Sequence, residues 1–311
     1  MIEIKNYNKE DKKEWDGLIK RSRADTFLFY RDFMDYHSSR FKDHSFLIFR
    51  KGKLEGLLPG NIQNDIFYSH QGLTYGGLIT TTKMTTIDVI RAFELINNCL
   101  RETGVTEVIY KPLPFIYQII PAQEDIYALF RLKAEKIACN ISSTIFQKNK
   151  IAFVESRKAG IRKGKRSEIT INETQNLESF WKILENNLKS KFEKKPVHSI
   201  NEIKLLKSFF PANIKLYTAS KNDKVLGGVL LFIMNRVIHV QYIAASQEGK
   251  ENGVLDLLFD ELINHIYAHI PVFDFGQSTE KMGDYLNEQL IFQKESFGGR
   301  GIVYETYKYS L

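Results

Sequence analysis

The fold of this chain is decided by the stretch Phe273, Asp274, Phe275, Gly276, Gln277, Ser278, Thr279, Glu280, with Lys294, Glu295, Ser296, Phe297, Gly298, Gly299, Arg300 a short segment later. The stretch begins as an apolar strand, 272–275, too short and too apolar for the edge of a sheet. Polar residues and glycine end it, and a short helix leads to a basic, glycine-rich turn. The sequence therefore predicts an inner strand whose C-terminal end carries a functional site.

The residues before and after this stretch predict a mixed α/β domain. A helix at 253–267 places Leu255, Leu258, Phe259, Leu262 and Ile266 on one face, as a core-facing helix does. The other predicted elements are strands at 168–172, 215–219, 225–234, 237–245 and 300–308, and helices at 177–190 and 200–209. The predicted order is strand, two helices, three strands, helix, strand, helix, strand.

The first half of the chain predicts nearly the same order of elements. They are strands at 1–7, 45–50, 54–63, 66–69 and 107–110, and helices at 9–21, 32–41 and 85–101. A repeated order indicates duplication. We therefore expect an α/β (α+β) protein with two tandem domains, 1–150 and 151–311, each a mixed central sheet flanked by helices.

Composition excludes several classes of protein. A 311-residue chain with 43% hydrophobic residues and no biased tract is expected to fold throughout. Met1 to Glu10 is polar, and no segment approaches the roughly 20 apolar residues of a membrane span, so a cytoplasmic location is expected. Cys99 and Cys139 have no metal-ligand or CxxC spacing, so we expect two core residues, no disulfide and no metal site.

Part of the net charge of +7 is local, because eight cations fall in one short stretch. They are Lys148, Lys150, Arg157, Lys158, Arg162, Lys163, Lys165 and Arg166. Such a cluster attracts the phosphates of a coenzyme, a nucleotide-sugar or RNA. A solvated linker face explains it equally well.

The element order, together with Phe273 to Gly276 and Lys294 to Gly299, resembles the GNAT superfamily. Within it, the chain is similar to the tandem-GNAT branch that contains the Fem-type peptidoglycan aminoacyl transferases and their acetyltransferase-like relatives. The resemblance covers nearly the whole chain, and its first half matches through 26–41 and 69–77.

The resemblance implies an acyl-CoA, such as acetyl-CoA, held between splayed fourth and fifth strands, here 237–245 and 272–275. Strand alternation predicts that His239, Gln241 and Ile243 share one face. The coenzyme pyrophosphate would lie on the loop that opens the next helix. The cofactor-binding residues predicted there are Gly249, Lys250, Asn252, Gly253 and Val254. Glu251 and Leu255 depart from the family pattern.

Fem-type relatives instead use an aminoacyl-tRNA as donor, and the basic stretch would then meet RNA phosphates.

Four residues are candidates for the chemistry that the resemblance implies. His239 could remove the proton of an amine, or be a hydrogen-bonded core residue. Asp274 could bind the amine. Lys294 could stabilise an oxyanion or a phosphate, or be a surface lysine at a helix C-terminus. Tyr285, in the helix predicted after the fifth strand, could protonate the leaving thiolate, or be an interfacial aromatic residue.

A glycine-rich segment, 69–77, predicts a binding loop in the first half. Related tandem enzymes bind the acceptor in a cleft that the first domain helps to form, so the resemblance implies acceptor contacts here. The predicted substrate-binding residues are Arg31, His37, His70, Tyr75 and Arg300. The acceptor would be a small or nucleotide-linked amine, such as the sugar of a cell-envelope precursor.

Three functions follow. The first is an N-acyltransferase that uses acyl-CoA. The second is an aminoacyl-tRNA-dependent ligase of peptidoglycan precursors, and the third is a GNAT-like binding protein without catalysis. The sequence leaves the acceptor, the acyl group and the oligomeric state open.

Overall fold

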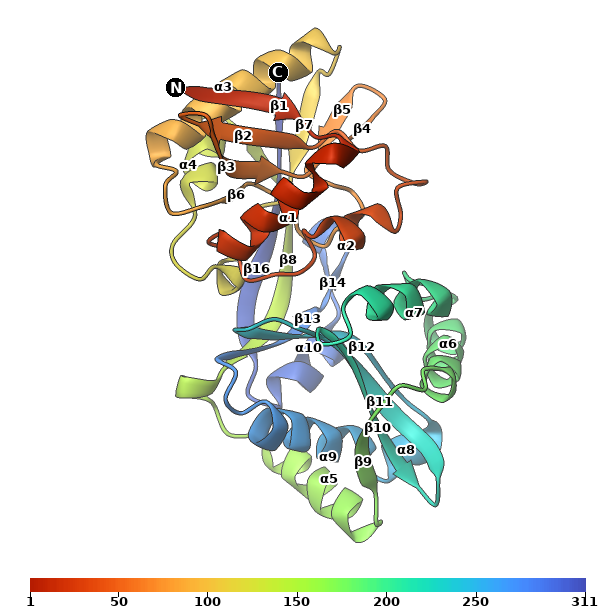
Figure 1. Cartoon of the computed structure of the whole chain (residues 1–311). Coiled ribbons are helices and arrows are strands. Elements are labelled where there is room, and N and C mark those ends of the chain that lie inside the picture. The colour runs from red at the N-terminus through yellow and green to blue at the C-terminus, as the bar shows by residue number, and fades with distance from the viewer. The chain divides into compact units, whose positions relative to one another are not determined.

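A computed structural model describes residues 1–311, apart from the side chains of 191 and 192 (Figure 1). The chain forms two compact units. Unit 1 comprises 1–141, 279–285 and 303–311, and unit 2 comprises 142–278 and 286–302. The sequence placed one boundary at 150. Each unit consists of separate segments of the chain, because two long strands, β8 (Glu135–Phe146) and β16 (Arg300–Ser310), have residues in both units.

Unit 1 has a four-stranded antiparallel sheet, in the order β1, β2, β3, β6. Its remaining strands β4, β5 and β7 pair with one another and with β16. The elements are β1 (Ile2–Asn6), α1 (Lys12–Arg21), α2 (Arg31–Asp35), β2 (Phe46–Arg50), β3 (Lys53–Leu58), β4 (Asn61–Gln63), β5 (Ile66–Tyr68), β6 (Ile79–Thr80), α3 (Thr86–Glu102), β7 (Glu107–Tyr110) and α4 (Glu124–Arg131).

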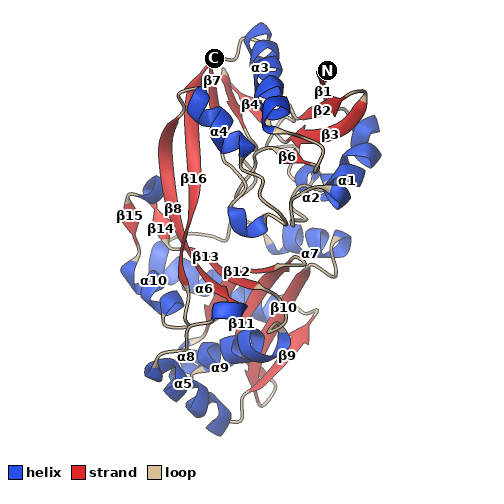
Figure 2. Cartoon of the chain, turned by 90° about the vertical axis from the view of Figure 1, so that its left-hand side faces the viewer, coloured by secondary structure: helices blue, strands red, loops and turns tan.

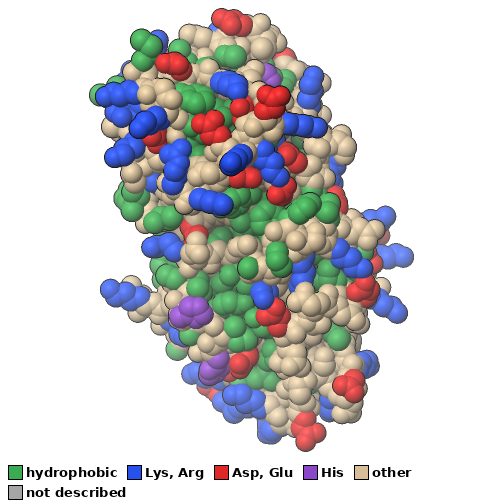
Figure 3. Space-filling view, in the orientation of Figure 1, with side chains coloured by type: hydrophobic (Ala, Val, Ile, Leu, Met, Phe, Trp, Pro, Cys, Tyr) green, Lys and Arg blue, Asp and Glu red, His purple; other side chains and the backbone are tan. Residues whose placement is uncertain are grey.

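Local sequence explains how the long helix of unit 1 starts and what it buries. Thr85 and Asp88 form a capping box at the N-terminus of α3. The helix buries Val89, Phe93 and Ile96 in a core that also takes residues of β2, β3 and β7. On the surface over β1 to β3 and α1, lysine and arginine side chains alternate with acidic ones (Figure 3).

Unit 2 has the element order that the sequence predicts, with one additional helix in front and a second, short one between the three consecutive strands and the predicted helix. The elements are α5 (Glu155–Arg166), β9 (Thr170–Thr174), α6 (Glu178–Phe192), α7 (Ile200–Phe209), β10 (Ile214–Lys221), β11 (Lys224–Ile233), β12 (Val237–Ala245), α8 (Gln247–Glu251), α9 (Val254–Glu261), β13 (Val272–Gln277) and α10 (Glu288–Glu295). The predicted mixed α/β class, with helices flanking mixed sheets, is confirmed. The basic stretch that could have been a linker is α5, which lies beside α9 (Figure 2).

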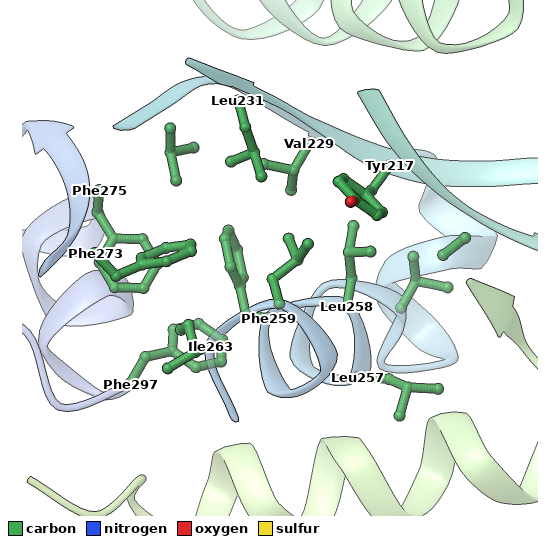
Figure 4. Packing of buried hydrophobic residues seen from close by; sticks show 14 of the residues in the cluster. Tyr217, Val229, Leu231, Leu257, Leu258, Phe259, Ile263, Phe273, Phe275 and Phe297 are labelled. Atoms are coloured by element: carbon green, nitrogen blue, oxygen red, sulfur yellow. The ribbon is translucent and has the colours of Figure 1, made fainter. Parts of the chain in front are cut away.

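The sheet of unit 2 separates a large apolar core from a second, more polar face. β9 to β12 are antiparallel neighbours, β13 lies parallel to β12, and β8 lies antiparallel to β13. Phe273 and Phe275 of β13 point into the core beside Phe259 of α9 and Phe297 (Figure 4). Strand alternation therefore places Asp274, between them, on the other face.

A β-bulge in β12 changes which residues share a face. Leu230 of β11 pairs with Tyr242 and Leu231 pairs with Val240, so Gln241 is one extra residue in the ladder. Ile243 consequently packs against the apolar core on the α9 side. The prediction that His239 and Ile243 share a face is therefore wrong, because regular alternation takes no account of the bulge.

β12 and β13 pair only over their first residues. The register runs from Val237 and Val272 to His239 and Asp274, whereas β12 continues to Ala245. The ladder thus ends at the pair formed by His239 and Asp274, the arrangement expected of splayed fourth and fifth strands.

None of the helices in the described part of the chain combines the length and the apolar composition that a membrane crossing requires. Cys99 and Cys139 are both free thiols. Cys99 is partly buried, but Cys139 is exposed on β8, so the prediction of two core cysteines is wrong for Cys139.

Candidate active site

His239 and Asp274 form a hydrogen-bonded pair at the last paired position of β12 and β13. The distance between His239 Nδ1 and Asp274 Oδ2 is 2.8 Å. The Asp274 side chain is fully buried, whereas 13% of the His239 side chain is exposed. The two residues come together because the parallel register places them side by side.

The other carboxylate oxygen of Asp274 accepts three hydrogen bonds. The donors are the hydroxyls of Ser142 at 2.5 Å and Thr144 at 3.2 Å, both on β8, and the Gly276 amide at 3.2 Å. Such donors favour the ionised carboxylate. An ionised carboxylate only accepts hydrogen bonds, so His239 Nδ1 donates to it, and in the neutral form of the imidazole the lone pair then lies on Nε2. This is the tautomer that a histidine base would need.

Gly276 turns the backbone between the carboxylate and Lys294. Its φ of +76° is a left-handed conformation that favours glycine. The register with β8 shifts between Asp274 and Gln277. The turn directs the Gly276 amide to Asp274, while Lys294 Nζ donates to the carbonyls of Gly276 at 2.8 Å and Gln277 at 2.6 Å.

Lys294 is a buried cation at the end of α10, with 4% of its surface exposed. Burial lowers its pKa to about 8, and the negative charge of Asp274 opposes this shift. It is therefore not a surface lysine, the alternative that the sequence left open. Its hydrogen bonds to the Gly276 and Gln277 carbonyls hold the backbone that follows Asp274.

The predicted pyrophosphate loop is largely folded into α8. The amide of Gly249 donates to the Ser246 hydroxyl, and those of Lys250, Asn252 and Gly253 donate to backbone carbonyls within 246–250. Gln241 and Ile243 are partly buried on β12. Val254 is fully buried in the apolar core.

α5 packs on the N-terminal end of α9, where the pyrophosphate was expected. A Cβ built on Gly253 would lie 2.4 Å from the Gly160 carbonyl oxygen. A Cβ on Gly160 would lie 1.9 Å from Asp256 Oδ2, and Arg157 forms a 2.8 Å ion pair with Asp256. Helix α5 thus covers this end of α9. The carboxylate of Asp256 lies in the first turn of α9.

Tyr285 is not in a helix. It lies in β15 (Tyr285–Leu286), which pairs with β14 (Thr279–Glu280), and 51% of it is exposed. The helix starts later because Asn287 caps it, its side chain accepting from the Leu290 amide. Arg300 is exposed at the start of β16, where its guanidinium donates to the Gly299 carbonyl.

In unit 1, two of the predicted acceptor contacts are buried among internal partners. Arg31 pairs with Asp35 at 2.5 Å and Asp43 at 2.8 Å. The Tyr75 hydroxyl lies 3.0 Å from that of Thr26.

His37 and His70 come together, as a ring stack with centroids 5.2 Å apart. His37 Nε2 lies 3.2 Å from the Gly72 carbonyl, and His70 has a φ of +67°. Burial, together with the charge of nearby Lys111, lowers the pKa of His70 well below its usual value. Burial also lowers the pKa of Lys111, to about 8, and its ammonium donates to the Leu73 carbonyl.

Sequence reasoning missed three polar residues at these sites. They are Ser142 and Thr144, which donate to Asp274 in unit 2, and Lys111, whose charge acts on His70 in unit 1. The alternation of Ser142 and Thr144 on one strand was the available signal. Among the residues whose side chains are described, no three His, Cys, Asp or Glu residues are arranged to hold a metal ion.

The chain resembles known proteins through one family model and several solved structures. The family model described as the acetyltransferase (GNAT) domain matches residues 158–285. No curated protein matches the chain significantly in sequence.

Solved structures match over nearly the whole chain. FemX has a TM-score of 0.70 at 10% identity, covering 99% of this chain and 97% of its own. L-PGS from Bacillus licheniformis has a TM-score of 0.63 at 11% identity, covering 98% and 92%. A tandem GNAT protein from the clavulanic acid biosynthesis pathway has a TM-score of 0.54 at 10% identity, covering 100% and 98%. At these identities the likeness concerns the fold.

Proposed function

We propose that this chain, a GNAT-domain protein with the tandem fold of FemX, is an N-acyltransferase that moves an acyl group from a thioester or ester onto an amine. The observation that carries the proposal is the pair of His239 and Asp274 at the point where the β12 and β13 ladder ends. An oriented base beside splayed strands fits deprotonation of an amine next to a bound acyl donor.

In the proposed reaction, the amine nitrogen attacks the acyl carbonyl while its proton passes to Nε2 of His239. Asp274 stabilises the imidazolium that forms, because its Oδ2 accepts the Nδ1 hydrogen at 2.8 Å. The tetrahedral intermediate then expels the thiolate or alkoxide, which takes up a proton.

Lys294 is proposed to act chiefly through the backbone. Its ammonium holds the carbonyls of Gly276 and Gln277, and the Gly276 amide holds Asp274. Lys294 would then be a positioning residue for the base, in addition to the oxyanion role that the sequence suggested.

Acyl-CoA, for example acetyl-CoA, is the first candidate donor, supported by the match of residues 158–285 to the GNAT family. Calorimetry with acetyl-CoA tests it. Lys250 is exposed on α8, so Lys250→Glu should weaken binding if the pyrophosphate lies there. Lys53→Glu, the same change at the exposed first residue of β3 in unit 1, is the matched control. Absence of any binding by the wild type would exclude the coenzyme.

A second candidate donor, an aminoacyl ester on tRNA, is favoured by α5. This helix covers the expected pyrophosphate position, and it carries exposed cations toward solvent, including Lys163 and Arg166. Binding of charged tRNA should weaken steeply with salt. Lys163→Glu with Arg166→Glu should flatten that salt dependence, whereas Lys51→Glu with Lys53→Glu should not.

For the acceptor, we propose that unit 1 supplies contacts from the segment 69–77. His37 and His70 stack there, and burial keeps the His70 imidazole uncharged, so the ammonium of nearby Lys111 is the group that suits an anionic acceptor such as a nucleotide-linked sugar or a cell-envelope precursor. The exposed Arg300 remains a proposed contact, whereas Arg31 and Tyr75 are buried among internal partners and are no longer proposed. Mass spectrometry of a panel of nucleotide-linked amino sugars incubated with each donor would identify the acceptor. A protein that binds them without transfer would support the non-catalytic alternative.

A further inference from the structure

Arg157, in the first turn of α5, joins α5 to two other elements of unit 2. Its Nη1 forms a 2.8 Å ion pair with Asp256 in the first turn of α9, and its Nε donates to the Ser296 hydroxyl at 2.7 Å. The guanidinium also lies over the ring of Phe297, 5.0 Å from the ring centroid. One side chain therefore holds α5, the start of α9 and the residues after α10 together.

Ser296 is the residue through which this link reaches α10. Its hydroxyl accepts from Arg157 and donates to the Gln293 carbonyl at 2.6 Å, and its amide donates to the Phe292 carbonyl at 2.9 Å. Its carbonyl accepts from the Val154 amide, just before α5, at 3.0 Å. The polar groups of Ser296 thus bond on one side to α10 and on the other to the start of α5, which fixes where α10 ends.

Lys294 lies in the last turn of α10, two residues before Ser296, and its ammonium donates to the carbonyls of Gly276 and Gln277. The Gly276 amide in turn donates to Asp274. A lysine side chain is a flexible four-carbon stem, so its ammonium stays at two carbonyls only while the backbone that carries it is fixed. The bonds at Ser296 supply that fixation.

We propose that Arg157 is a positioning residue for the base of the reaction. It fixes Ser296 and the end of α10, so that Lys294 keeps the turn at Gly276 bonded to the carboxylate that orients His239. The inference rests on the acyl transfer proposed above. It gives α5 a role in the chemistry that is separate from covering the start of α9.

An arginine suits this role better than a lysine. The guanidinium is planar and donates in fixed directions, one used for Asp256 and one for Ser296. The ring of Phe297 supports the plane of the guanidinium, and this ring is fully buried and stacks on Phe275 in the core (Figure 4). The link therefore rests on the core of unit 2.

The first test follows Lys294 by NMR in protein whose lysine side chains carry ¹³C, and it needs no substrate. Burial lowers the pKa of Lys294 to about 8. Arg157→Gln should raise this pKa toward 10.5, because an ammonium that leaves its buried position regains water. Ser296→Ala breaks the same link without a change of charge and should have the same effect. Lys294→Met identifies the signal, since the pKa of Lys111 is also lowered to about 8.

The second test is steady-state kinetics with acetyl-CoA or aminoacyl-tRNA, whichever the wild type uses, and a nucleotide-linked amino sugar. Arg157→Gln and Ser296→Ala should each lower kcat by about 10–100-fold and change KM for the amine by less than about threefold. The double variant should lose no more than either single one, because both break one link. Arg157→Lys keeps the charge but not the two fixed directions, and it should recover only part of kcat.

Arg50→Gln is the matched control. Arg50 pairs with Asp88, in the first turn of α3, at 2.7 Å, and the two side chains are 28% and 17% exposed, close to the 22% and 15% of Arg157 and Asp256. The change removes the same kind of ion pair from unit 1. It should leave kcat and the pKa of Lys294 unchanged.

Three results would overturn the inference while leaving the proposed function standing. They are a pKa of Lys294 that stays near 8 in folded Arg157→Gln and Ser296→Ala, a kcat of Arg157→Gln equal to that of the wild type, and additive losses of kcat in the double variant. A wild type that transfers no acyl group would overturn the proposed function and, with it, the role of Arg157 in orienting the base.

Discussion

His239 and Asp274 stand side by side at the last rung of a parallel ladder, with Nδ1 of the imidazole 2.8 Å from Oδ2 of the carboxylate. Beyond this rung β12 continues without pairing to β13. The strand geometry at the end of the ladder therefore also orients the imidazole that we propose as the base. Because Asp274 is fully buried and Ser142, Thr144 and Gly276 donate to its other oxygen, the pair is fixed before any substrate arrives.

We expect Asp274→Asn to remove most activity while retaining the fold. The amide oxygen of asparagine can still accept from Ser142, but its NH₂ group would face His239 Nδ1 and favour the tautomer whose Nε2 carries hydrogen. The base is then lost, and kcat should fall by about 10²–10⁴-fold. Steady-state kinetics alongside urea unfolding separates the two effects.

Asp125→Asn is the control for this change. Asp125 is also a buried carboxylate, in unit 1, where it accepts from the Tyr110 hydroxyl at 2.7 Å and burial raises its pKa to about 6. It should affect stability without affecting kcat. Equal activity of the wild type and Asp274→Asn would show that His239 is not the base.

Gly276→Ala should damage activity more than stability explains. The φ of +76° costs a side chain about 1–2 kcal/mol, and the added Cβ would lie 3.4 Å from His239 Cε1. A shift of the Gly276 amide would release Asp274, and kcat should fall by about 10–100-fold.

Gly52→Ala gives the same backbone strain without the same contacts. Gly52 has a φ of +71° in the turn between β2 and β3, and a Cβ there meets no atom within 4 Å. Both variants should unfold at lower urea concentration, and only Gly276→Ala should lose activity. Matching activity losses in the two would assign the effect to strain alone.

The order of elements in unit 2 could be predicted because apolar periodicity reports which face of each helix and strand is buried. The family resemblance, rather than periodicity, made His239, Asp274 and Lys294 candidates. Sequence reasoning could not find their pairing, because the register between β12 and β13 depends on long-range packing. It also misplaced Ile243, because the bulge at Gln241 has no local signal in the sequence.

Two other features depend on contacts between distant segments. Gly160 of α5 meets Asp256 of α9, so a stretch that the sequence described only as basic is a packed helix with one apolar side. His198 reaches Tyr242 from a connection 44 residues away in sequence. No spacing rule joins such residues, and only the folded chain brings them together.

Stability should depend on pH through Lys294. A lysine whose pKa is lowered to about 8 on folding binds its proton less tightly in the folded protein than in the unfolded chain, where the value is 10.5. Protonated Lys294 therefore destabilises the folded state below pH 8. This penalty is lost as the pH rises from about 8, the folded pKa, toward 10.5, the unfolded pKa. Relative to Lys294→Met, the wild type should gain about 2 kcal/mol of unfolding free energy between pH 7.5 and 9.5.

Comparing wild type with variant removes the contribution of Lys111, whose pKa is also lowered to about 8 but which both proteins retain. Loss of the hydrogen bonds to Gly276 and Gln277 adds an offset that does not vary with pH. Urea unfolding at several pH values gives the difference directly. Parallel curves for the two proteins would show that Lys294 keeps an ordinary pKa in the folded state.

Glycine-to-alanine changes in two helices should have opposite effects, if α5 is held against α9 as described. At Gly160 the new Cβ would lie 1.9 Å from Asp256 Oδ2, so either α5 or the Asp256 side chain must shift and disturb the ion pair with Arg157, at a cost of about 2–4 kcal/mol. At Gly17, inside α1, a Cβ meets nothing within 4 Å, and alanine should stabilise the helix by about 0.5–1 kcal/mol. Thermal unfolding of both variants measures the difference. A stabilising Gly160→Ala would mean that α5 does not cover the start of α9, and the pyrophosphate position predicted at Gly253 would then be open to a coenzyme.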